Sequence, residues 1–103
     1  MANYLLVYHG GSMPETPEEG AQVMQAWTDW FAAIGDAVID GGNPASQTKT
    51  INVDGSVALD SSGPSGYSVL RAGSLDAAVE LAKGCPVLKG GASIQVVETF
   101  NAM

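Results

Sequence analysis

The sequence predicts an α+β fold in which two helices pack on one mostly antiparallel sheet. The stretch from Gly66 to Phe100 divides into strand, helix and strand, with breaks at Gly84-Cys85-Pro86 and Gly90-Gly91. A short apolar strand and a long amphipathic helix open the chain, and an Asp-Gly pair between β-prone runs indicates a hairpin in the middle. The order strand, helix, hairpin, strand, helix, strand is that of a ferredoxin-like sandwich.

The first strand is expected at Tyr4–His9, an apolar run that ends at Gly10-Gly11. Its apolar residues do not alternate with polar ones, which is typical of a strand buried on both faces. Because side chains alternate along a strand, His9 shares a face with Leu5 and Val7.

The first helix is expected from Pro17 to Ile34, with Gly35 as its C′ residue. Thr16 suits the N-cap, and Glu19 at the third helical position completes a capping box with it. One apolar stripe at helical spacing consists of Val23, Trp27, Trp30, Phe31 and Ile34.

The middle of the chain is expected to hold short extended pieces. Ala37–Asp40 forms the first, closed by the turn-forming run Gly41-Gly42-Asn43-Pro44. Thr48–Val53 and Ser56–Asp60 flank Asp54-Gly55, and this spacing predicts a hairpin with a type I′ turn.

The last third contains a strand at Gly66–Ala72, a helix at Ser74–Lys83 with Ser74 as its N-cap, and a strand at Ser93–Phe100. The buried stripe of the helix is predicted to be Leu75, Ala78, Val79 and Ala82. The last strand places Ile94, Val96 and Glu98 on one face and Gln95, Val97 and Thr99 on the other.

The composition limits the partners of the protein. The chain has 103 residues, enough for one domain, and 11 acidic against 4 basic residues, for a net charge of -7. No basic run exists to neutralise phosphates, so nucleic acid and anionic membranes are not expected as partners. Cys85 is the only cysteine, and no apolar run approaches a membrane span or a signal peptide, so a cytoplasmic location is predicted.

No cofactor or metal is expected. The paired glycines do not form a phosphate loop or a dinucleotide-binding fingerprint, and one histidine without a cysteine cluster makes a poor zinc site. A second copy of the chain is expected instead. The strands Tyr4–His9 and Tyr67–Ala72 carry apolar residues on both faces, whereas helices cover only one, so we predict a homodimer with sheets packed face to face.

His9 and Asp40 are the candidate catalytic residues. His9 is the only histidine and stands at a strand end before a Gly-Gly loop, where an imidazole can act as a general base. Its other interpretation is a surface residue held by a backbone carbonyl. Asp40 could orient His9 or bind a substrate hydroxyl, or it could only bond the backbone of the glycine-rich turn.

Candidate ligand-binding residues are Trp27, Tyr8, Tyr67 and Arg71, each with a structural alternative. The three aromatic residues could line a small-molecule cavity or simply form core. Arg71 could bind an anionic substrate or pair with a surface carboxylate. Cys85, which has no activating histidine nearby in sequence, is predicted to be a buried packing residue.

An ordered set of short segments spans nearly the whole chain. It consists of Tyr4–His9, Trp27–Gly35, Asp40-Gly41-Gly42-Asn43-Pro44, Gly66-Tyr67-Ser68-Val69, Ser74-Leu75-Asp76-Ala77-Ala78, Ala82-Lys83-Gly84-Cys85-Pro86 and Gly90-Gly91-Ala92-Ser93-Ile94-Gln95-Val96. This set resembles the YCII-related family, including its DGPF-type members. The resemblance implies one YCII-related domain over residues 1–103 that pairs with a second copy as a dimeric α+β barrel.

Most YCII-related proteins have no assigned activity. Some carry a His and an Asp on the first helix, proposed to do acid–base chemistry by analogy with lactone isomerases and cofactor-free oxygenases of the same barrel. Here Met24 or Gln25 and Ala33 or Ile34 stand at those positions. The resemblance implies a small cofactor-independent enzyme acting on a small cyclic or aromatic substrate; the alternative is a non-catalytic ligand-binding or structural dimer.

Overall fold

A computed structural model describes residues 1–60 and 62–102. The elements in chain order are β1 (Ala2–Gly10), α1 (Pro17–Ile34), η1 (Gly35–Ala37), β2 (Val38–Asp40), β3 (Lys49–Ile51), β4 (Val57–Leu59), β5 (Gly66–Ala72), α2 (Leu75–Ala82), η2 (Pro86–Gly90) and β6 (Ala92–Glu98). Four strands form an antiparallel sheet of order β2-β5-β1-β6, and β3 pairs with β4 in a separate hairpin. The predicted α+β fold with two helices is confirmed, and its strand order is compatible with a ferredoxin-like arrangement.

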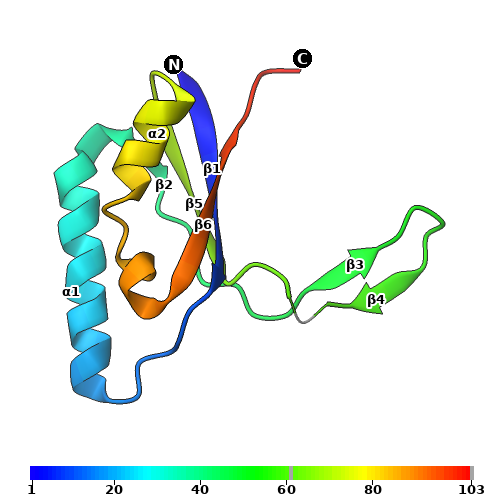
Figure 1. Ribbon diagram of the computed structural model, residues 1–103, viewed down its shortest axis with the longest axis horizontal. Coiled ribbons are helices and arrows are strands. Elements are labelled where there is room, and N and C mark those ends of the chain that lie inside the picture. Colours follow the sequence, from blue (N-terminus) through cyan, green and yellow to red (C-terminus); the bar gives the residue numbers. More distant parts are fainter. Residues whose placement is uncertain (61, 103) are drawn as a thin grey trace.

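Both helices lie against one face of the sheet, and the β3–β4 hairpin projects on the other side (Figure 1). The core forms between the helices and the sheet. We call the opposite side of the sheet the open face. Its side chains, assigned from strand alternation and pairing, are Asn3, Leu5, Val7 and His9 of β1, Tyr67, Val69 and Arg71 of β5, and Ser93, Gln95 and Val97 of β6.

Within a single copy of the chain, only one face of strand β1 is buried. Tyr4, Leu6 and Tyr8 point toward the helices and are buried, whereas Leu5 and Val7 are half-buried on the open face. The prediction that this strand is buried on both faces therefore does not hold for one copy alone, because both helices lie on the same side.

The termini of α1 follow the sequence prediction. The Thr16 hydroxyl accepts the Glu19 N–H at 3.1 Å, and Gly35 ends the helix with φ 55°. The predicted capping box differs in one bond, because the Glu19 carboxylate accepts the N–H of Glu15, at 2.9 Å, rather than that of Thr16. Val23 is 41% exposed and lies outside the core, which α1 enters only in its second half.

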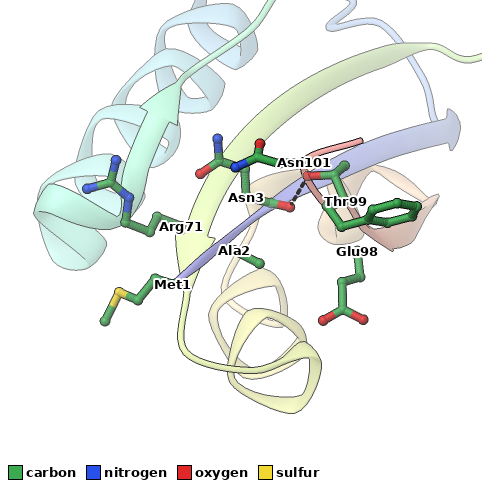
Figure 2. A pocket seen from close by; sticks show the side chains of 8 residues that line it. Met1, Ala2, Asn3, Arg71, Glu98, Thr99 and Asn101 are labelled. Atoms are coloured by element: carbon green, nitrogen blue, oxygen red, sulfur yellow. Dashed lines mark hydrogen bonds between the residues drawn. The ribbon is translucent and has the colours of Figure 1, made fainter. Parts of the chain in front are cut away.

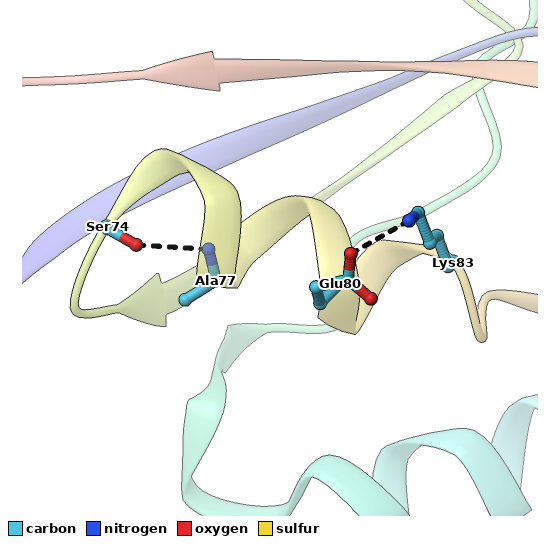
Figure 3. A network of polar contacts seen from close by, with 4 residues as sticks. All are labelled: Ser74, Ala77, Glu80 and Lys83. Carbon is cyan, nitrogen blue, oxygen red and sulfur yellow. Dashed lines mark hydrogen bonds and ion pairs between the residues drawn. The ribbon is translucent and has the colours of Figure 1, made fainter.

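Helix α2 is short and locally stabilised (Figure 3). The Ser74 hydroxyl accepts the Ala77 N–H at 3.1 Å, as its predicted N-cap role requires, and Lys83 pairs with Glu80 at 2.8 Å on the surface. Ala78 and Ala82 are buried as predicted, whereas Leu75 in the first turn is exposed. The small residues let α2 lie close to the sheet.

The hairpin turn differs from the predicted type I′. Lys49 pairs with Leu59 and Ile51 with Val57, so three residues, 53–55, form the loop rather than two. Among the described residues only glycines have positive φ, and in this loop that is Gly55, at 89°. The Gly55 N–H donates to Asn52 O at 2.8 Å, and Asn52 N–H donates to Ser56 O at 2.7 Å. This is a type I turn followed by a glycine bulge, which spares Asp54 the left-handed conformation.

The hairpin also sets the overall shape. The radius of gyration is 15.1 Å, against about 13 Å for a compact domain of 100 residues. The excess reflects the projecting hairpin (Figure 1). No helix within residues 1–60 and 62–102 combines the length and the apolar character that crossing a bilayer requires.

Candidate functional site

His9 lies on the open face near the end of β1, on the same side as Leu5 and Val7, as predicted. Its Nε2 is 2.7 Å from Oε1 of Gln95 on the neighbouring strand β6. An amide oxygen can only accept, so Nε2 donates in this bond, and in the neutral ring Nδ1 is then the acceptor nitrogen. Gln95 therefore holds the imidazole in one orientation on the open face.

Two more polar side chains lie around His9. Val7 pairs with Tyr67 on one side and with Gln95 on the other, and His9 pairs with Ser93. Diagonal neighbours on one face are about 7–8 Å apart, within reach of a long side chain. We call His9, Gln95, Tyr67 and Ser93 the His9 cluster. This cluster places the imidazole of His9 and the phenol of Tyr67 around Val7.

Asp40 is not brought to His9. It lies opposite Val69 on β5, which in turn lies opposite Leu5, four residues before His9. Standard strand spacings put the two residues about 16 Å apart. Asp40 Oδ1 accepts the Gly42 N–H at 2.8 Å, which is the turn-stabilising role.

Tyr8 and Trp27 lie on the helix side of the sheet, opposite His9. Their ring centroids are 5.8 Å apart in an edge contact, and Trp27 also packs on Trp30 and Phe31 at 5.7 and 5.6 Å. The Trp30 Nε1–H donates to Leu81 O at 3.1 Å. These rings pack together in the space between α1 and the sheet, so Tyr8 and Trp27 form core rather than a wall beside His9.

A buried polar chain ties this core to the sheet edge. The Tyr8 hydroxyl donates to Ser68 Oγ at 2.7 Å, and Ser68 donates to Gly41 O at 2.7 Å. Burial raises the pKa of Tyr8 well above its ordinary value, and it raises the pKa of the Cys85 thiol. Cys85 is buried and free, as predicted for a packing residue.

Arg71 lies at the opposite end of the open face from His9. It pairs with Asn3, six residues before His9 on β1, which is about 20 Å along the strand. It borders a hollow that is lined by Met1, Ala2, Asn3, Arg71, Glu98, Thr99, Phe100 and Asn101 (Figure 2). Among residues 1–60 and 62–102, no carboxylate lies within ion-pair distance of its guanidinium.

Sequence reasoning missed Gln95 and Ser93 as neighbours of His9 and Ser68 as a buried bridge. The signal for Ser68 was a lone hydroxyl on the inward face of an apolar strand. For Gln95, the signal was the alternation along the last strand, which assigns this residue to one face of the sheet. Alternation alone does not reveal which strand lies beside β1. In the described part of the chain, no three side chains of metal-ligating type converge.

No model of a known protein family matches this chain, and no curated protein matches it. The YCII-related resemblance therefore stays a prediction.

Proposed function

We propose that this chain is a YCII-related homodimer, paired through its open faces as a dimeric α+β barrel, in which His9 transfers a proton on a small cyclic or aromatic molecule. The observation that carries the proposal is the Nε2–Gln95 hydrogen bond of 2.7 Å, which orients the single histidine on the sheet face that no helix covers. A general base must turn an acceptor nitrogen toward its substrate, and a hydrogen bond at the other ring nitrogen orients the imidazole to do so.

The apolar side chains of the open face support the dimer. Leu5, Val7 and Val69 form a half-buried apolar row at its centre. Two sheets that pack face to face lie about 10 Å apart, with side chains interdigitating between them. Removing this row from water stabilises a dimer and excludes water from the neighbouring His9 cluster.

Three members of the cluster have a role in the proposed reaction. His9 Nδ1 takes the proton from a carbon next to a substrate carbonyl and returns it to another position. Tyr67 donates a hydrogen bond to the carbonyl oxygen as negative charge develops there. Gln95 holds the imidazole and does not exchange protons itself. Neither Asp40 nor Trp27 takes part, because of where they lie.

Proton exchange tests this proposal. A panel of small lactones and cyclic ketones is incubated with the protein in D₂O, and loss of the α-proton is followed by NMR. His9→Gln is expected to slow enzyme-dependent exchange by about 10²–10⁴-fold, whereas the control Asp40→Asn leaves it unchanged. Equal exchange by the wild-type protein and His9→Gln would refute the catalytic role.

A second candidate function is a dimer that binds a small ligand or serves only as a structural module. The packed rings of Tyr8, Trp27, Trp30 and Phe31 favour the purely structural module, because they occupy the space between α1 and the sheet. A thermal-shift screen separates the candidates. A binding module is stabilised by a compound that is recovered chemically unchanged.

A further inference from the structure

The β3–β4 hairpin, residues 49–59, which we call the arm, has one apolar face. Lys49 pairs with Leu59 and Ile51 with Val57, so these side chains share a face, and Thr50 and Ala58 lie on the other. Ile51, Val57 and Leu59 are 74, 61 and 75% exposed. Within residues 1–60 and 62–102 of one copy, this face of the arm is left exposed.

An arm of this kind is poorly stable in isolation. A two-stranded hairpin is at best marginally stable in water, and contiguous exposed apolar side chains mark an interaction surface. The two strands of the arm make few packing contacts with the other helices and strands. The arm projects on the side of the sheet away from the helices (Figure 1). A partner seated on the open face would therefore meet the arm as well.

The apolar area supports a second copy as that partner. A stable homodimer buries about 800 Å² per copy, of which about 65%, or roughly 520 Å², is apolar. Fully burying one Val, Leu or Ile removes about 60–120 Å². The five apolar or aromatic side chains of the open face are half or more shielded already, so they supply only about 125–250 Å². The arm, more fully exposed, adds a similar area. The two regions together supply about 250–500 Å², so the dimer approaches the requirement only when both are buried.

We propose that the apolar face of the arm packs against the second copy in the dimer formed by the open faces. This inference rests on the proposed dimer and adds the arm as its second contact region. The arm leaves the sheet beside the His9 cluster, where the Ser65 N–H donates to Tyr8 O at 2.7 Å. The docked arm therefore closes the dimer interface at the end that holds His9.

Sedimentation equilibrium on the full chain tests the arm. The variant Ile51→Ser/Leu59→Ser is expected to weaken dimerisation at least tenfold, whereas the control variant Ala58→Ser, on the opposite face of the arm, leaves it unchanged. Tryptophan fluorescence checks that the core is intact in each. Unchanged dimerisation in the double variant, or an equal loss in Ala58→Ser, would overturn the proposal.

Two further measurements separate this inference from the proposed dimer. Val97→Lys on the open face is expected to dissociate the dimer; if it does so and the arm variant does not, only the arm proposal fails. A wild-type monomer at all concentrations overturns both. In the wild-type protein, amide exchange of residues 49–59 is expected to slow as the dimer forms, and exchange at unprotected rates in the dimer overturns the arm proposal.

Discussion

Ser68 is the side chain whose removal should destabilise this protein most for its size. It is fully buried, accepts from the Tyr8 hydroxyl and donates to Gly41 O, both at 2.7 Å. Ser68→Ala leaves both groups without this partner, and a buried group left unsatisfied costs about 1–3 kcal/mol. We expect a loss of about 2–4 kcal/mol from a total of about 5–15 kcal/mol.

A double-mutant cycle with Tyr8→Phe makes this prediction specific. Tyr8→Phe alone leaves Ser68 bonded to Gly41 and should cost about 0.5–1.5 kcal/mol. In the Ser68→Ala background it removes an unsatisfied hydroxyl and should cost nothing or restore stability. Urea unfolding at one fixed protein concentration measures all four proteins, with Ser12→Ala in the loop after β1 as the exposed control. Additive losses, or a Ser68→Ala loss below about 0.5 kcal/mol, would refute the reasoning.

Three further predictions concern single positions. Because the folded-state pKa of Tyr8 is raised, the contribution of Tyr8 to stability should be constant below about pH 10 and fall above it, and Tyr8→Phe should reduce the slope of stability against pH there by about 1.4 kcal/mol per pH unit in alkaline urea titrations. Gly42→Ala should abolish folding by circular dichroism, because φ is +76° and a Cβ would overlap Tyr67 O, whereas Gly73→Ala, with open space around it, should be tolerated. Thr16→Ala should lower the stability by about 1 kcal/mol in thermal unfolding, and Thr16→Ser should restore most of it.

The sequence by itself determined the elements whose causes are local. The N-caps Thr16 and Ser74, the helix end at Gly35 and the alternation along β6 were all predictable, since each depends on residues within one turn or strand. The α+β class followed from the order of these elements. The hairpin existed as predicted, but its turn type depended on a register shifted by one residue, which the Asp54-Gly55 pair alone does not specify.

Only the tertiary structure decided which residues meet. His9 and Gln95 are 86 positions apart, and Tyr8 and Ser68 are 60 apart, so no spacing rule could pair them. Strand order placed Asp40 two strands from His9, and the choice of helix side put Tyr8 in the core while leaving His9 on the open face. Local preferences act between residues that are near in sequence. These contacts instead depend on how separate strands and helices pack, so the packing of the whole sheet determines all of them at once.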